Sequence, residues 1–408
     1  MITYPKEWHK IKISDLGYFY SGLSGKKAED FGKGNAYYIT FLNVLKNNIV
    51  DFGILEKVRI DGFETQNEVK LNDLLFNTSS ETPEEVGMCA AVTIDAKNVY
   101  LNSFCFGFRL FNKDEILPLY ASYLFNSKYG RESVVFATQG STRYNLSKRY
   151  FSKIELTIPP LSEQSEIVSV LIEIDNHIEN LTNIIEKKTQ IREGVLSELL
   201  SGKTRILNFQ NKWVETTLAD ITKQIITGGT PSTLIDDFWG GDIPWLSSTE
   251  IHQKNVTTPS KYITNFGLQN SSAQIVPANS VLIALAGQGK TRGSAAYLTI
   301  PMAINQSLAA LVSLENIDSK FLYYLMESKY AELRELSSGD GGRGGLNKSI
   351  LKKIVITIPT ELNEQIEISA SLTLIDEEIE LLMKEKDKLV KIKDGVLDQV
   401  LIGSIRLK

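Results

Sequence analysis

Apolar residues recur at alternating steps of four and three positions in two long stretches of the chain. The first series is Ile167, Leu171, Ile174, Ile178, Leu181 and Ile185, and the second is Ile368, Leu372, Ile375, Ile379 and Leu382. This spacing is typical of a coiled-coil seam, in which one stripe of each helix faces a partner helix. The pattern therefore predicts two long helices whose seams pack against each other.

Cap and turn residues give the expected limits of these helices. Ser162 and Asn363, each followed by a glutamate, offer N-cap chemistry, and Gly202 and Gly403 suit C-terminal stops. A helix of about 38 residues at ~1.5 Å per residue would be ~57 Å long. An alternative interpretation of the same pattern is a pair of amphipathic helices that pack on separate cores.

The chain is a tandem repeat. The segment Ile154–Pro159 reappears 200 residues later as Ile354–Pro359, and one inserted residue then makes the offset 201. Further matches at that offset are Glu163-Gln164 with Glu364-Gln365, Ile174-Asp175 with Ile375-Asp376, and Gly194-Val195-Leu196 with Gly395-Val396-Leu397. The openings of the halves also correspond, and the stretches in between match poorly. Each half is therefore a divergent domain followed by a better-matched helical tail.

The order of these parts gives the expected direction of the helices. The first helix ends near Ser201, the second domain begins near Trp213, and the second helix leaves that domain near Ile350. If the two ends of the domain lie close together, the second helix runs back along the first. We expect an antiparallel pair with one domain at each end.

The divergent domains combine strand and helix patterns. Short apolar or alternating runs predict strands, and longer runs predict helices. The strands are expected at Ile154–Ile158, Phe104–Phe111, Val281–Ala286 and Leu308–Val312, and the helices at Leu117–Lys128 and Ser319–Lys329. Aromatic residues within the two helices are interpreted as core. The expected fold class is α+β: two tandem mixed α/β domains separated by two long helices that form an antiparallel coiled coil, with pseudo-two-fold symmetry.

The net charge of −5 does not by itself suggest a nucleic-acid partner, because such proteins usually carry a basic excess. The acidity lies mainly in the helical tails. Residues 151–206 hold nine acidic and six basic side chains, and residues 351–408 hold eleven and nine. A surface that binds nucleic acid would therefore be a local patch on residues 1–150 or 207–350.

Composition narrows the class of protein further. The 42% hydrophobic and 23% charged residues are typical of a soluble globular chain. No apolar run is long enough for a membrane helix, and no secretory signal is visible. The two cysteines, Cys89 and Cys105, lack metal-ligand spacing and favour a reduced cytosolic pair. We expect a cytoplasmic protein without a metal site or membrane partner.

The loop Gly287–Thr291 resembles a phosphate-binding loop only in part. The motif requires a glycine five positions before Gly289, and residue 284 is an alanine. An ATP site is therefore not favoured. Glycines nevertheless let a backbone approach DNA closely, and Gln288, Lys290, Thr291 and Arg292 supply groups for phosphates and base edges.

Two arginines lie at matched positions, 200 residues apart, in loops that lead into the tails. Arg343 lies in the glycine-rich segment 339–345, and Arg143 lies in the counterpart 140–144. A flexible linker would also explain the glycines. The matched arginines favour phosphate contacts.

Asp61, Glu68 and Lys70 loosely fit the carboxylate–carboxylate–lysine pattern of metal-dependent nucleases. The pattern is weak, because a glutamate two residues from a lysine is common on charged surfaces. The chain also lacks the Asn- or Asp-Pro-Pro-aromatic motif of adenine methyltransferases. No catalytic centre is therefore expected.

The whole chain resembles the specificity subunit of type I restriction–modification systems. The resemblance rests on Gly228–Ser232, Gly241–Trp245, Asn305-Gln306, Leu346–Lys348 and the helix start at Pro159–Gln164. The first half departs from the pattern, with Gly22–Lys26 in place of Gly-Gly-Thr-Pro-Ser. This family implies two target-recognition domains, each of which reads half of a bipartite, asymmetric DNA site.

The resemblance also implies partners and domain limits. The expected partners are double-stranded DNA, two methyltransferase subunits on the helices, and motor–nuclease subunits attached through them. S-adenosylmethionine, ATP and Mg²⁺ would belong to those partners, with no cofactor in this chain. The recognition domains are expected at residues 1–153 and 211–353, and the strand ends with the spacer helices at 154–210 and 354–408.

Candidate DNA-binding residues come from loops of both recognition domains. They are Ser24, Lys26, Lys27, Thr78, Ser79, Ser80, Arg143, Tyr144, Thr230, Ser232, Ser247, Ser248, Gln288, Lys290, Thr291, Arg292 and Arg343. Two other functions stay open at this stage. One is a nuclease with a metal site at Asp61, Glu68 and Lys70, and the other is a coiled-coil adaptor that makes no DNA contact.

Overall fold

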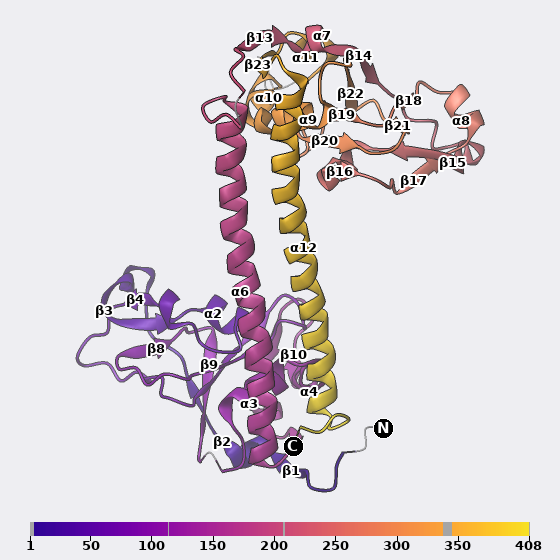
Figure 1. Ribbon diagram of the computed structural model, residues 1–408. Helices are drawn as coiled ribbons and strands as arrows, with labels where there is room; N and C mark the ends of the chain where they lie inside the picture. The colour runs from indigo at the N-terminus through magenta and orange to yellow at the C-terminus, as the bar shows by residue number, and fades with distance from the viewer. Residues whose placement is uncertain (1–3, 113, 207–208, 338–344, 408) are drawn as a thin grey trace. The chain divides into compact units, whose positions relative to one another are not determined.

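The computed structural model describes residues 4–407 except 113, 207–208 and 338–344. The chain forms two compact units, which are described separately. Unit 1 comprises Met1–Thr182 with Lys384–Lys408, and unit 2 comprises Asn183–Met383. Each unit therefore combines one divergent domain with the beginning of one long helix and the end of the other (Figure 1).

The divergent domain of unit 1 contains two main sheets. The four-stranded sheet has the order β2-β9-β5-β7, and the three-stranded outer sheet has the order β4-β3-β8. The strands are β1 His9–Lys12, β2 Gly17–Ser21, β3 Phe31–Ile39, β4 Glu56–Val58, β5 Leu74–Asn77, β6 Ser79–Ser80, β7 Cys89–Ala91, β8 Val99–Leu101, β9 Cys105–Leu110, β10 Thr138–Gln139, β11 Tyr144–Leu146 and β12 Glu155–Ile158. The helices are α1 Ile13–Leu16, α2 Phe41–Lys46, α3 Pro118–Asn126, α4 Lys128–Phe136 and α5 Lys148–Phe151.

Unit 2 repeats this arrangement with one more strand in each sheet. The five-stranded sheet has the order β14-β22-β19-β20-β16, and the four-stranded sheet has the order β17-β15-β21-β18. Its strands are β13 Trp213–Thr217, β14 Thr222–Thr227, β15 Trp239–Leu246, β16 Asn255–Val256, β17 Lys261–Ile263, β18 Gln274–Val276, β19 Ser280–Ala284, β20 Ala295–Leu298, β21 Met302–Ile304, β22 Leu308–Ser313 and β23 Val355–Pro359. Its helices are α7 Leu218–Ile221, α8 Asn265–Gln269, α9 Ser319–Ser328, α10 Tyr330–Leu336 and α11 Lys348–Lys352.

The aromatic residues of α3 and α9 lie in the cores, as predicted. Tyr120 and Tyr123 of α3 are buried with Phe76 of β5 and with Leu171 of the first long helix. Phe321, Tyr323 and Tyr324 of α9 occupy the same place in unit 2. The four-stranded sheet of unit 1 and the five-stranded sheet of unit 2 are therefore each joined to a long helix through a layer of aromatic side chains.

Both ends of each divergent domain are paired as neighbouring strands. β1 pairs antiparallel with β12, with His9 opposite Ile158, and β13 pairs antiparallel with β23, with Trp213 opposite Pro359. The chain therefore enters and leaves each domain at the same place. This pairing confirms the assumption about domain ends from which the helix direction was inferred.

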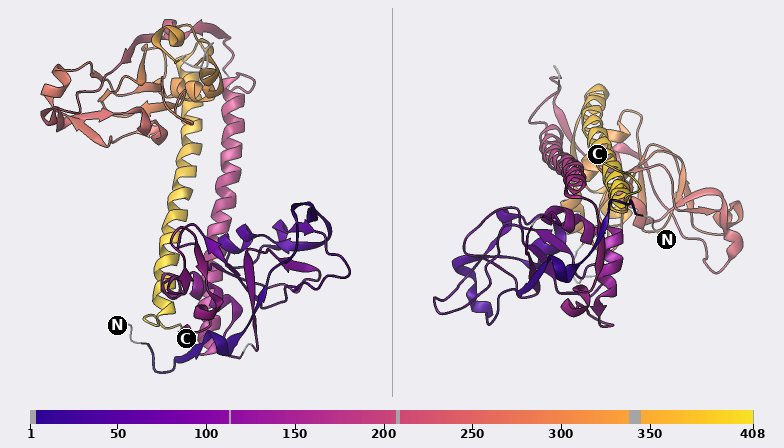
Figure 2. Two further views of the ribbon diagram at one scale, coloured as in Figure 1. Left: turned by 180° about the vertical axis from the view of Figure 1, so that it is seen from behind. Right: turned by 90° about the horizontal axis from the view of Figure 1, so that it is seen from below.

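The two long helices are α6 Leu161–Leu200 and α12 Leu362–Leu401. In unit 1 the beginning of α6 lies beside the end of α12, where Lys393 Nζ is 2.5 Å from Asp175 Oδ1 (Figures 1 and 2). In unit 2 the end of α6 lies beside the beginning of α12, where Lys188 Nζ is 2.7 Å from Glu378 Oε1. The paired segments run antiparallel in both units, as predicted.

The predicted seam residues differ in burial along each helix. Ile167, Leu171, Ile368 and Leu372 are buried because they also face a divergent domain. The more central residues Ile174, Ile178, Ile185, Ile375, Ile379 and Leu382 are only partly buried, whereas Leu181 is buried. The ends of the helices therefore hold most of the apolar packing.

A matched polar contact fixes the start of each long helix. In unit 1, Arg406 donates two hydrogen bonds to Glu163, of 2.6 and 2.9 Å, and Trp8 Nε1 donates a third, of 3.1 Å. In unit 2, Arg205 and Trp213 donate to Glu364 in the same way. The repeated glutamates therefore bind an arginine that follows the other long helix.

The N-cap prediction was wrong. Ser162 and Asn363 lie inside the first turn, because α6 begins at Leu161 and α12 at Leu362. Pro160 accepts the early hydrogen bond from the Gln164 amide, and the glutamate side chains bind distant residues instead. The predicted stops are confirmed, since Gly202 and Gly403 follow the helices with positive φ of 68° and 72°.

Candidate functional site

Three other segments of unit 2 are hydrogen-bonded at one short turn, Asn305–Ser307, between β21 and β22. The amide of Gly229, after β14, donates to the carbonyl of Ile304, 3.0 Å away, and the amide of Leu285, after β19, donates to Ser307, 2.8 Å away. The amide of Asn305 donates to Leu246, at the end of β15, over 3.0 Å. We call this turn and the loops bonded to it the loop junction of unit 2.

Glycine makes the close approach at the junction possible. A Cβ atom at Gly228 would lie 1.7 Å from the carbonyl oxygen of Ile304. Nearby, the indole of Trp245 donates to the carbonyl of Gly229 over 3.0 Å, and Thr230 Oγ1 donates to Gln306 Oε1 over 2.7 Å. The glycine, tryptophan and Asn-Gln motifs of the sequence therefore belong to one structural feature.

Unit 1 builds the same junction from a different sequence. The amide of Leu23 donates to Leu101 over 2.7 Å, and the amide of Thr78 donates to Phe104 over 2.9 Å. The amide of Asn102 donates to Ile39 over 3.0 Å. These three bonds match those of Gly229, Leu285 and Asn305, so the turn Asn102–Phe104 corresponds to Asn305–Ser307.

The turn itself is held by its asparagine. Asn102 Oδ1 accepts the amide of Phe104 over 2.8 Å, and Asn305 Oδ1 accepts the amide of Ser307 over 3.1 Å. Sequence reasoning selected Asn305-Gln306 and missed Asn102. The repeat contained the signal, because Asn102 precedes the β9 strand as Asn305 precedes the matching β22 strand.

The loop Gly287–Gly293 extends from the junction of unit 2. Tyr330 and Arg334 of α10 donate hydrogen bonds of 3.0 and 2.5 Å to the carbonyls of Lys290 and Gly289. The side chains of Gln288 and Lys290 are exposed. A phosphate-binding loop leads into the N-terminus of a helix. The loop Gly287–Gly293 leads into strand β20 instead, so it lacks that part of a phosphate site. Tyr330 and Arg334 carried no sequence motif that could have identified them.

The corresponding loop of unit 1 is organised by a small sheet. Strand β11 pairs with β6, with Tyr144 opposite Ser80 and Asn145 opposite Ser79. The structure therefore brings together three of the predicted DNA-binding residues, Ser79, Ser80 and Tyr144. Arg143, which is exposed, lies next to them in the chain. Beneath the loop, Arg131 donates to the carbonyls of Pro83 and Val86, and burial lowers the pKa of its guanidinium to about 10.

Other predicted residues are less accessible. The side chain of Lys26 is only 5% exposed and lies 2.5 Å from Glu64 Oε1. Hydrogen bonds from Lys26 and Gln66 lower the pKa of Glu64 to about 2. Ser79 and Ser248 are buried.

The remaining candidates are surface or partly buried groups. Ser24 and Lys27 are exposed near the junction of unit 1, as are Thr230 and Ser232 in unit 2. The partly buried ones are Thr78, Ser247, Thr291 and Arg292. Arg343 lies outside the described residues. The DNA-binding role of all the candidate residues stays a prediction.

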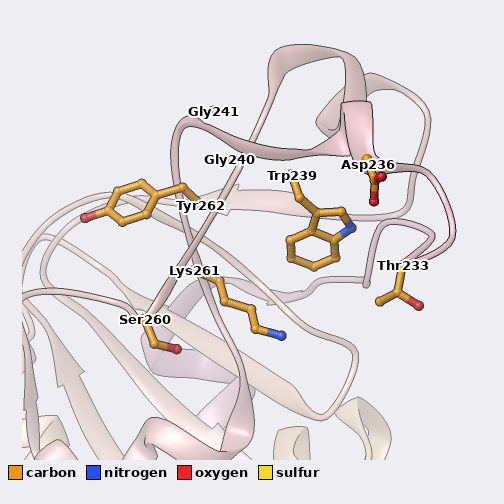
Figure 3. A pocket seen from close by; sticks show the side chains of 8 residues that line it. All are labelled: Thr233, Asp236, Trp239, Gly240, Gly241, Ser260, Lys261 and Tyr262. Atoms are coloured by element: carbon orange, nitrogen blue, oxygen red, sulfur yellow. The ribbon is translucent and has the colours of Figure 1, made fainter.

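A bulge in β15 forms a cavity beside Ser232. The register of β15 against β17 shifts between Trp239 and Ile243. The Trp239 indole donates to the Ser232 carbonyl over 3.0 Å, and Lys261 Nζ lies 5.6 Å from its ring. Figure 3 shows Thr233, Asp236 and Lys261 around the indole, with Tyr262 pointing away. The cavity has a volume of about 530 Å³.

The residues of the alternative nuclease site have separate partners. Asp61 lies 3.5 Å from Arg59, Glu68 accepts the amide of Asn98, and the amide of Lys70 donates to Asp73. Across the described part of the chain, no three His, Cys, Asp or Glu side chains are grouped as a metal site. The geometry gives the nuclease interpretation no support.

The chain matches the family described as the type I restriction modification DNA specificity domain. The match covers residues 5–190 and 210–391, one copy in each half. The chain therefore belongs to this family. It is a specificity subunit of a type I restriction–modification system with two target-recognition domains, and is not itself catalytic.

Similar proteins are named as type I restriction enzyme specificity subunits. The type I restriction enzyme MjaVIII specificity subunit of Methanocaldococcus jannaschii is 27% identical, over 99% of this chain and 94% of its own. The EcoR124I/EcoR124II specificity subunit of Escherichia coli is 28% identical, over 56% of this chain and 57% of its own.

Solved structures share the fold. The S subunit of a type I restriction–modification system from M. genitalium has a TM-score of 0.62 at 18% identity, over 98% of this chain and 96% of that chain. A chain from a study of the assembly and conformational transition of the type I system has a TM-score of 0.58 at 15% identity, over 99% and 100% of the two chains. Specificity subunits of these systems bind DNA and assemble with other subunits. No described helix is both long and apolar enough to span a membrane.

Proposed function

We propose that the two loop junctions are the DNA-reading surfaces of this subunit, each of which contacts one half of a bipartite, asymmetric target. The proposal is supported by one observation: the backbone hydrogen bonds of the two loop junctions are equivalent, whereas their side chains differ. Three backbone hydrogen bonds and the bond from the asparagine side chain recur in both units. The side chains of the turns nevertheless differ, because unit 1 has Ser103-Phe104 where unit 2 has Gln306-Ser307. Equivalent scaffolds with different side chains favour the reading of different base pairs.

The chemistry of the junctions supports this role. Hydroxyl, amide and ammonium groups in the junction loops of unit 2 come from Thr230, Gln306, Gln288 and Lys290. Amides pair bidentately with adenine, and hydroxyl and ammonium groups contact bases or phosphates. Exposed Lys27 and Arg143 provide cations in unit 1. These local groups bind phosphate although the chain as a whole is acidic.

We further propose that α6 and α12 carry two DNA methyltransferase subunits, through which motor–nuclease subunits attach. The seams use part of each helix surface, and apolar residues such as Ile191, Leu374 and Leu381 remain exposed. S-adenosylmethionine, ATP and Mg²⁺ are proposed to be bound by those partners in the cytoplasm, and no cofactor is proposed for this chain.

The proposal is tested at Gln306, an exposed amide of the junction in unit 2. In the assembled methyltransferase complex, Gln306→Ala should relax discrimination at one base pair of one half-site, by about 1–3 kcal/mol. The other half-site should be read as before. The measurement is binding to a set of duplexes that carry single substitutions across the target.

Gln190→Ala is the matched control, because Gln190 is an exposed glutamine on α6. This variant should leave discrimination at every position unchanged. If Gln306→Ala and Gln190→Ala gave the same profile, the junction would not be the reading surface. A complex that binds every duplex equally would instead favour an adaptor without sequence reading.

A further inference from the structure

Phe104 is an exposed aromatic residue at the centre of the loop junction of unit 1. It lies in the turn between β8 and β9, and 58% of the residue is exposed. Its neighbours in the junction are polar, since Ser103 is exposed and Thr78 donates both its amide and its hydroxyl to the Phe104 carbonyl. The ring of Phe104 is therefore an exposed apolar group among polar neighbours.

The backbone of Phe104 is fixed on both sides. Its amide donates to Asn102 Oδ1 over 2.8 Å, and its carbonyl accepts from Thr78. The next residue, Cys105, is buried in the core beneath the outer sheet. The ring is therefore presented from a rigid turn, which lowers the entropy lost when it makes a contact.

The position is structurally equivalent to Ser307 in unit 2. The Ser307 amide donates to Asn305 Oδ1, and its carbonyl accepts from Leu285. Because the backbone roles are the same, the fold does not require a phenyl group at residue 104. The difference between Phe104 and Ser307 is available for specificity.

The extent of burial indicates how the ring is used. Phe63 of the same unit is 104% exposed and stands free, whereas less than half of Phe104 is covered. Part of Phe104 is therefore packed on the protein, and the rest is available for a contact. In DNA, the apolar group that distinguishes one base is the 5-methyl of thymine.

Resting on the proposed function, we infer that Phe104 contacts the 5-methyl group of a thymine in the half-site read by the first domain. Ser307 makes no such contact in the other half-site. Phe104 is thus a specificity-determining residue that favours an A·T pair at one position through an apolar contact. The half-site of the first domain contains at least one thymine at a specified position.

The test replaces each thymine of the target in turn with deoxyuridine, which lacks only this methyl group. Binding is measured with the assembled methyltransferase complex. In the wild type, one uracil in the half-site of the first domain should weaken binding about fourfold, the effect of exposing one buried methyl. With Phe104→Ser, the same replacement should have no effect, and Phe104→Leu should retain part of it.

Phe63→Ser is the control and should keep the wild-type response to uracil. Equal responses of the wild type and Phe104→Ser at every position, with target discrimination intact, would overturn this inference and leave the proposed function standing. A first half-site without thymine on either strand would overturn it as well. If the wild-type complex bound every duplex with equal affinity, the proposed function itself would be contradicted.

Discussion

Arg192 of α6 donates two hydrogen bonds to Asp376 of α12, of 2.9 and 3.1 Å, within unit 2. The arginine is 6% exposed and also pairs with Glu327 of α9, 2.5 Å away. Tyr324 donates to the same aspartate over 2.9 Å. In unit 1 the corresponding group is Lys393, Asp175 and Tyr123. A cation near the end of each helix thus meets an aspartate of the other helix and a tyrosine of the recognition domain.

Removing this cation should destabilise unit 2. Arg192→Ala leaves two carboxylates without their buried partner, which we expect to cost about 2–3 kcal/mol of unfolding free energy. Arg192→Lys should cost less, because unit 1 uses a lysine at the matched position. Chemical denaturation of the purified chain measures both. Equal stability of the alanine and lysine variants would show that the contact contributes little.

The ion pair of Lys26 predicts a dependence of stability on pH. The pKa of Glu64 falls from 4.5 to about 2, mainly through its hydrogen bond with Lys26. A lowered carboxyl pKa adds stability that is complete above about pH 4.5 and is lost as the pH falls toward 2. Thermal melts of the wild type and Glu64→Gln should therefore differ at neutral pH and converge near pH 2. A constant difference across this range would argue against the pair.

Arg143 is expected to contact DNA without reading its sequence. Arg143→Ala should weaken binding to all duplexes alike and lower the slope of log affinity against log salt by roughly one. Arg343→Ala, at the matched sequence position, should do the same. Salt titrations of the assembled complex measure the slopes. Unchanged affinity at every ionic strength would refute the phosphate contact.

The helical seam is expected to be required for assembly. Ile178 and Ile379 are partly buried on α6 and α12, and an aspartate at either position would place an unpaired charge in an apolar stripe. The double variant Ile178→Asp, Ile379→Asp should lose its methyltransferase partners. Light scattering gives the mass of the complex, and an assembly of full size would contradict the prediction.

The sequence predicted the parts of the fold that depend on local spacing. Steps of four and three identified both long helices, and the repeated Thr-Ile-Pro motif identified the strands that end each domain. The helix predicted at Leu117–Lys128 corresponds to α3, Pro118–Asn126, whereas the helix α4 that follows it was not predicted. The two helices are separated at Ser127, whose side chain accepts a hydrogen bond from the Gly130 amide and caps α4. The spacing of apolar residues did not indicate this cap, because the capping group is a polar side chain.

The candidate site was less predictable because backbone groups build it. The bond between the amide of Thr78 and the carbonyl of Phe104 requires no particular side chain. Lys26 was selected as a loop cation, but only its distance from Glu64, 38 residues away in sequence, shows that it is paired. Such contacts depend on tertiary folding, so neither charge nor periodicity contains them.

Each recognition domain is expected to read its own half-site. Equivalent domains on duplex DNA favour half-sites about one helical turn apart, roughly 34 Å or ~10 bp. Lengthening both long helices by one heptad, ~10 Å, should alter the gap alone. The half-site sequences should not change, because the junctions lie within the recognition domains.

The most direct test is methylome sequencing of cells in which residues 212–345 have been replaced by the corresponding domain of a relative. The expected result is a bipartite methylated motif in which one half-site changes while the other half-site and the gap stay the same. A continuous palindromic motif, or a motif unaffected by the exchange, would contradict it.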